Sequence, residues 1–160
     1  MEGIRPDNTL KISHMEGTIY RCVDSVEDSE DLRRLFTELT GIDTVPDVGR
    51  INRLVAGGGL AFYAAFCGER MVGMVSVLPC RTAATDKLWI EDVAVLSDFR
   101  GRGIGRALLK FAMEDSPRRF GGDVFYLTSR PSRTAARRMY ESMGFTQYET
   151  GVFYMKVDNT

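Results

Sequence analysis

The stretch DFRGRGIGRALL, residues 98–109, joins two apolar patterns of different period. Residues 88–96 form an apolar run of strand length, and the apolar side chains that follow recur at helical spacing, at Ile104, Leu108, Phe111 and Ala112. Glycines between a strand and a helix let backbone N–H groups turn toward a ligand, and the first helical turn adds unpaired N–H groups and partial positive charge. Full positive charges come from Arg100, Arg102 and Arg106. The stretch therefore predicts a phosphate-binding loop.

Two common phosphate loops do not match this stretch. A Walker loop ends in Gly-Lys-Ser/Thr, which Ile104-Gly105-Arg106 does not supply. A Rossmann fingerprint needs a small residue where Arg106 stands, and it usually lies in the first βα unit. A third pattern fits, because Arg100-x-x-Gly103-x-Gly105 resembles the pyrophosphate loop of the GNAT superfamily of N-acetyltransferases. A glycine turn before a surface helix is the alternative reading of the loop alone.

Two further motifs strengthen the resemblance. Glu91-Asp92-Val93-Ala94-Val95 stands just before the loop, as the coenzyme-binding strand does in that family. Ala136-x-x-x-Tyr140-x-x-x-Gly144-Phe145 is similar to the family's C-terminal helix and its Gly-Phe exit. Together the motifs cover Trp89 to Phe145 in the expected order. The chain is thus identified as resembling a bacterial, small-molecule-type GNAT acetyltransferase.

The resemblance implies an α+β fold with a strongly bent, mixed and mostly antiparallel sheet of six or seven strands and about four helices. The two central strands, 88–96 and 124–128, would run parallel and splay apart. The apolar patterns predict the other strands at 18–23, 60–66, 71–78 and 152–157, and helices at 30–39, 47–56, 103–114 and 133–143. We expect a flexible N-terminal lead-in over residues 1–16, which includes the single histidine, His14, and one GNAT-like domain over residues 17–158.

The resemblance also implies acetyl-CoA as the co-substrate and assigns residues to it. The pantetheine amides would pair with the backbone of Val93, Ala94 and Val95. The pyrophosphate would be held by Arg100, Gly101, Arg102, Gly103, Ile104, Gly105 and Arg106. The family often has Asn seven residues before the tyrosine, where this chain has Arg133. Arg133 is expected to reach the coenzyme, or else to be a solvated arginine on a helix.

Direct acetyl transfer to an amine in a ternary complex needs a base, an oxyanion donor and an acid. Strand alternation places Glu91, Val93 and Val95 on one face, and Asp92 and Ala94 on the other. Glu91 is the predicted base, with Asp92 as the alternative, and the Val93 N–H is a candidate oxyanion donor. The resemblance puts Tyr140 near the coenzyme sulfur as general acid, and a packing tyrosine is the other reading.

Composition excludes several other classes. The chain has 160 residues and a net charge of −1, so nothing global favours nucleic acid or a membrane surface. Three widely spaced cysteines favour reduced thiols in a cytoplasm over disulfides or a metal site; they are Cys22, Cys67 and Cys80. Acidic residues gather at 24–47 and arginines at 100–138, which suits a cationic amine and a polyphosphate coenzyme, or two solvated surfaces.

Three functions follow from these patterns. The first is an acetyl-CoA-dependent N-acetyltransferase acting on a small-molecule amine, without metal. The second is a protein or peptide N-acetyltransferase. The third is a non-catalytic CoA-binding module, which the presence of both Glu91 and Tyr140 disfavours. The resemblance to the family also implies a homodimer.

Overall fold

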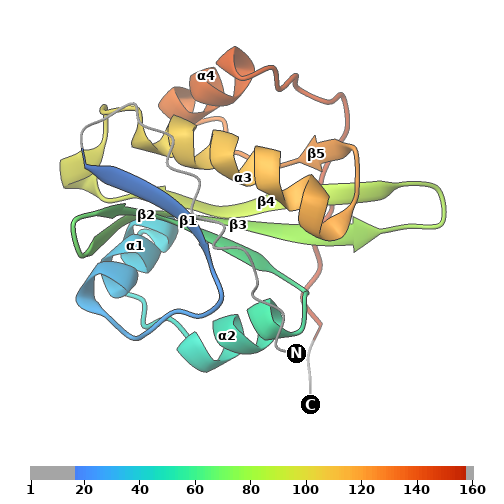
Figure 1. Ribbon diagram of the computed structural model, residues 1–160. Coiled ribbons are helices and arrows are strands. Elements are labelled where there is room, and N and C mark those ends of the chain that lie inside the picture. Colours follow the sequence, from blue (N-terminus) through green and yellow to red (C-terminus); the bar gives the residue numbers. More distant parts are fainter. Residues whose placement is uncertain (1–16, 158–160) are drawn as a thin grey trace. The chain divides into compact units, whose positions relative to one another are not determined.

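The computed structural model describes residues 17–157, and Figure 1 shows them as a ribbon. They form two compact units, one ending at Thr128 and the other beginning at Ser129. The lead-in predicted at 1–16, with His14, lies outside the described residues. No helix in the described part of the chain is long and apolar enough to cross a membrane.

The first unit contains the whole sheet and three of the α-helices. In chain order its elements are β1 (Thr18–Val23), α1 (Glu30–Thr40), α2 (Val48–Ala56), β2 (Ala61–Cys67), β3 (Arg70–Arg81), β4 (Asp86–Val95), the 3₁₀ turn η1 (Ser97–Phe99), α3 (Ile104–Phe120) and β5 (Val124–Tyr126). The second unit contains α4 (Thr134–Ser142). The α+β class and the four helices predicted from sequence are confirmed.

The sheet has the order β1-β2-β3-β4-β5. The first four strands pair antiparallel, and β5 pairs parallel with β4. Only Lys87–Trp89 of β4 has partners on β5, whereas β4 continues to Val95. The two central strands therefore part beyond Trp89, which confirms the predicted splay and leaves one edge of β4 without a strand partner among the described residues.

Helices cover both faces of this sheet, with α3 on one face and α1 and α2 on the other (Figure 1). A Cβ added to Gly73 of β3 would lie 3.4 Å from Leu108 Cδ2, so the α3 side chains sit directly on this glycine. Leu32 and Leu35 of α1 and Leu108 and Leu109 of α3 are fully buried. Burial of these side chains fixes the helices that flank β4.

Two sequence expectations are corrected. The sheet has five strands where six or seven were predicted, because residues 152–157 are not a strand. A strand needs a hydrogen-bonded neighbour, and these residues pair with none in the described chain; Phe153 is 98% exposed. Helix α3 was expected to stop before Pro117 but continues to Phe120. Pro117 removes one helical hydrogen bond, while Ser116 remains buried and Asp115 pairs with Arg119 across the proline.

Candidate active site

A β-bulge interrupts β4 at Asp92. Met74 and Ser76 of β3 lie opposite Ala94 and Glu91, so three steps on β4 match two on β3. Asp92 has φ 53°, the only positive value outside glycine in the described residues. Asp tolerates this left-handed conformation better than most side chains, and such strain is typical of functional sites. Because the extra residue leaves Asp92 and Val93 without β3 partners, the Val93 N–H remains a candidate oxyanion donor.

The bulge changes which side chains share a face of β4. Residues opposite each other on a ladder share a face, so Glu91 lies with Ser76 and Ala94 with Met74. Strand alternation predicted Ala94 on the face opposite Glu91. This prediction was wrong, because the bulge brings both side chains to the same face. Val95 lies opposite Gly73, on the face covered by α3. Glu91 is therefore on the opposite face of the sheet, the side of α1 and α2.

Two effects raise the pKa of the Glu91 carboxylate. Its side chain reaches solvent, but the surrounding protein partly desolvates the carboxylate, which raises its pKa above the usual glutamate range. The neighbouring Asp92 carboxylate raises the pKa of Glu91 further. The Ser76 hydroxyl across the ladder is fully buried and has no hydrogen-bond partner among the described residues. A partly desolvated carboxylate with a raised pKa is a candidate for proton transfer.

An aromatic pair extends the Glu91 face along β4. Trp89 lies opposite Tyr126 of β5, with ring centroids 5.5 Å apart. The Lys87 ammonium lies 5.0 Å from the Tyr126 ring centroid. Both rings are only half-buried. An acceptor whose amine reached Glu91 would have an amphipathic surface beside it.

The predicted phosphate loop has the geometry of an anion cradle. Gly101 has φ 72° and Gly103 has φ 77°, so both are in the left-handed region that glycine enters freely. A Cβ added at either position would have no heavy atom within 4 Å. Gly103 is the N-cap of α3, whose first-turn N–H groups have no side-chain cap. These groups fit a pyrophosphate, which they would hold at the positive end of the helix dipole.

The arginines of the loop differ in their contacts. Arg100 donates from Nε to the Val95 carbonyl at 3.0 Å and from Nη2 to Glu38 Oε2 at 2.5 Å. Arg102 donates to the Asp98 carbonyl at 2.8 Å, and its guanidinium lies 5.1 Å from the centroid of the Phe99 ring. Both side chains thus make contacts that hold the loop in its conformation, a role that the motif alone did not indicate. Ile104 is buried at the base of α3, and Arg106 is exposed.

Beyond Trp89 the edge of β4 that faces away from β3 has no strand partner in the described chain. The Leu96 N–H donates to the Val72 carbonyl of β3 at 2.9 Å. Because backbone groups alternate in direction along a strand, those of Val95 point to the other edge, where Arg100 meets the Val95 carbonyl. The backbone groups of Val95 therefore face the edge that β5 leaves open. The pairing of pantetheine with the backbone of Val93, Ala94 and Val95 stays a prediction.

The second unit contains the remaining predicted site residues. Tyr140 of α4 is buried, and its ring lies edge-on to Phe145 at a centroid distance of 5.9 Å. The Phe145 N–H donates to the Tyr140 carbonyl at 3.1 Å, which closes the Gly-Phe exit of the helix. Burial raises the pKa of Tyr140, and the charge of Arg133 opposes that rise. The hydroxyl therefore stays protonated at neutral pH, as an acid must. Arg133 is exposed at the N-cap position.

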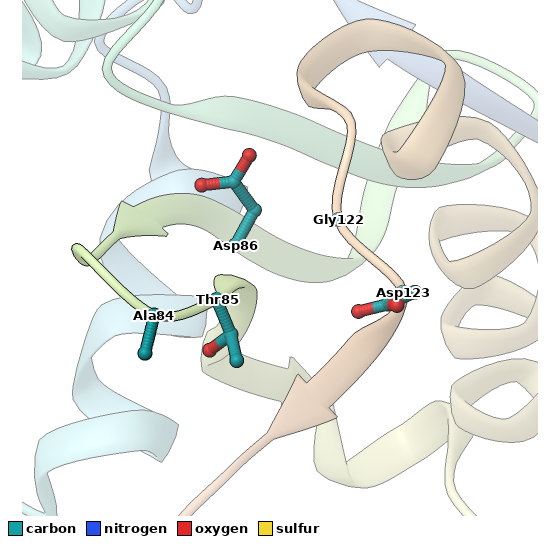
Figure 2. Close-up of a pocket in the computed structure, with 5 residues that line it drawn as sticks. All are labelled: Ala84, Thr85, Asp86, Gly122 and Asp123. Carbon is teal, nitrogen blue, oxygen red and sulfur yellow. The ribbon is translucent and has the colours of Figure 1, made fainter.

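A cavity of about 430 Å³ lies at the other end of β4. Figure 2 shows its lining, which comes from the β3–β4 turn, the first residue of β4 and the α3–β5 turn: Ala84, Thr85, Asp86, Gly122 and Asp123. Asp86 begins β4, whereas the phosphate loop follows its last residue, so the two regions are separated by the length of a ten-residue strand. Within residues 17–157 no group of His, Cys, Asp and Glu side chains could hold a metal ion.

Comparisons with known proteins point to one family. Residues 27–145 match the model of the acetyltransferase (GNAT) family. The chain is 32% identical over 95 residues to rat N-acetyltransferase family 8 member 3, covering 58% of this chain and 40% of that protein. It is 31% identical over 92 residues to the ribosomal protein bS18-alanine N-acetyltransferase of Escherichia coli K12, covering 53% and 62%. The chain thus spans less than two thirds of these curated relatives.

A solved structure shares the fold. The structure of AAC(6')-Iy in complex with the bisubstrate analog CoA-S-monomethyl-acetylneamine superposes with a TM-score of 0.70 at 19% identity. The match covers 88% of this chain and 99% of that one. At this identity the likeness concerns the fold alone.

Proposed function

Because the chain belongs to the GNAT family of acetyltransferases, we propose that it transfers an acetyl group from acetyl-CoA to the primary amine of a small molecule. The observation that carries this proposal is the bulged end of β4. It brings together a raised-pKa carboxylate, an open strand edge and a left-handed glycine loop at a helix N-terminus. Each of these serves one part of the reaction.

The residues divide the chemistry as follows. Acetyl-CoA supplies an activated acetyl thioester. Glu91 accepts a proton from the substrate ammonium, which frees the nitrogen lone pair to attack the thioester carbonyl. The Val93 N–H donates to the carbonyl oxygen as that oxygen gains charge. When the C–S bond breaks, Tyr140 donates its proton to the departing sulfur. The second proton of the attacking nitrogen then returns to the Tyr140 oxygen, so that the products are an amide, a free thiol and the proton held by Glu91.

A protein N-terminus is the second candidate acceptor. One relative is named for acetylating alanine on ribosomal protein bS18. The small-molecule reading is supported by the half-buried Trp89 and Tyr126 rings beside Glu91, which suit the body of a compact amine. A binding module without catalysis would have no use for the raised pKa of Glu91.

An amine panel with a free-thiol readout tests the proposal. We expect thiol release from acetyl-CoA that depends on at least one small primary amine and that exceeds release with peptides bearing free N-terminal alanine or lysine side chains. Turnover with the peptides alone would show that the acceptor is a protein or peptide amine. Saturable acetyl-CoA binding with no turnover across both sets would favour the binding module.

Glu91→Gln should lower kcat/KM by at least about 100-fold, because general-base catalysis typically contributes that much. In the parent enzyme, kcat/KM should rise with pH through a pKa above the usual glutamate range, since the base must lose its proton first. The variant should lack this acidic limb and keep any limb due to the amine. Asp92→Asn is the matched control: loss of the limb in that variant, with a normal limb in Glu91→Gln, would make Asp92 the base.

We also propose a cytoplasmic protein that acts as a homodimer and binds no nucleic acid. All three cysteines are free thiols in the structure, which suits a reducing compartment. A sedimentation mass near 17.9 kDa, the mass of one chain, would contradict the dimer.

A further inference from the structure

Glu38, near the end of α1, joins two segments of the phosphate loop. Its Oε1 accepts from the Ser97 N–H at 3.2 Å and its Oε2 accepts from Arg100 Nη2 at 2.5 Å. The same arginine donates to the Val95 carbonyl at 3.0 Å. One carboxylate thus connects the start of η1, the first residue of the glycine motif and, through Arg100, the open edge of β4.

A second ion pair from the same helix face supports this connection. Arg34 lies one turn before Glu38 and donates to Asp98 Oδ2 at 3.2 Å. Arg34 thus faces Asp98, and one turn later Glu38 faces Arg100. The charges on α1 are therefore complementary to those on the loop. The Glu38 side chain is 25% exposed and the Arg100 side chain is 55% exposed, so the carboxylate is the more buried partner of this surface pair.

From these contacts we propose that Glu38 is a positioning residue for the coenzyme. It holds Arg100 so that the glycine loop and the Val95 carbonyl are already in their binding arrangement before acetyl-CoA arrives. The proposal rests on the coenzyme role of the loop given above. Its basis is preorganisation, since a loop that is already ordered loses less conformational entropy when it binds a ligand.

The sign of the effect separates this role from a purely electrostatic one. Glu38 carries a negative charge close to the site of a polyanion. If it acted only through that charge, Glu38→Gln would strengthen coenzyme binding, because repulsion would fall. If it positions the loop, the same variant must weaken binding, because the amide holds Arg100 less firmly. The two roles therefore predict opposite shifts in affinity.

The test measures CoA affinity by calorimetry and steady-state constants for acetyl-CoA, in the parent and in Glu38→Gln. We expect the Kd for CoA and the KM for acetyl-CoA to rise about 5- to 10-fold, the scale of one or two immobilised side chains, with kcat within twofold. Asp28→Asn is the matched control, since Asp28 pairs with Arg33 at the start of the same helix and contacts no loop residue in the described structure. Its constants should not change.

Arg100→Gln provides the second variant. If Glu38 acts through Arg100, the double variant Glu38→Gln/Arg100→Gln should bind CoA no more weakly than Arg100→Gln alone. Unchanged or tighter binding in Glu38→Gln, or fully additive losses in the double variant, would overturn the positioning role while leaving the proposed function intact. A parent protein that binds no CoA at all would overturn both.

Discussion

Gly103→Glu is expected to abolish coenzyme binding. Gly103 is the N-cap of α3 and has φ 77°, and the position of a Cβ there is open to the space in which we place the pyrophosphate. A glutamate would put bulk and negative charge among the N–H groups that should meet the phosphates. In the parent, acetyl-CoA should raise the melting temperature by mass action on the folded state. In the variant this rise should disappear.

Gly68→Glu is the matched control for that experiment. Gly68, in the β2–β3 turn, also has a left-handed φ, of 61°, and a Cβ added there would likewise have no heavy atom within 4 Å. Both variants should lose about 1–2 kcal/mol of stability from the strained backbone. Only Gly103→Glu should lose the coenzyme shift. An undiminished shift in folded Gly103→Glu would remove the loop from the binding site.

Tyr140→Phe is expected to lower the turnover rate by roughly 10²–10⁴, the range typical of general acid–base catalysis. The change keeps the ring that packs against Phe145 and removes only the hydroxyl. Because burial raises the pKa of Tyr140, the parent donor is protonated throughout the neutral range. Coenzyme affinity should change little, since the hydroxyl acts on the transition state. The rate should be measured at saturating amine, together with the melting temperature.

Tyr20→Phe is a suitable control for this substitution. Tyr20 of β1 is also buried with a raised pKa, and its strand stands three places from β4 in the sheet order. Loss of the Tyr20 hydroxyl should leave the turnover rate unchanged. If Tyr140→Phe has the melting temperature of the parent and its turnover rate falls by less than about threefold, Tyr140 is a packing residue, because acid catalysis contributes far more than that. A pre-steady-state burst in the parent would show that product release limits the rate, and single-turnover rates then replace kcat in the comparison.

Local rules predicted some elements correctly and failed at others. Ser29 caps α1 through its side chain and Gly41 ends it, as short-range preferences indicate. The rule that a helix stops before proline failed at Pro117, where burial on the sheet and the Asp115–Arg119 pair extend the last turn. The apolar pattern at 152–157 predicted a strand, but pairing requires a neighbour that a pattern does not specify.

The sequence by itself determined the glycine turn and the helix that follows it, because left-handed glycines and a helix start are local properties that short spacings encode. It also identified Glu91 as a carboxylate in an apolar strand. Only the tertiary structure decided which face Glu91 occupies, since the bulge at Asp92 arises from the register with β3. The contacts of Glu38 with Ser97 and Arg100 span 59 and 62 residues. Partners that far apart meet only when the sheet and α1 have packed, and no short-range pattern records their distance.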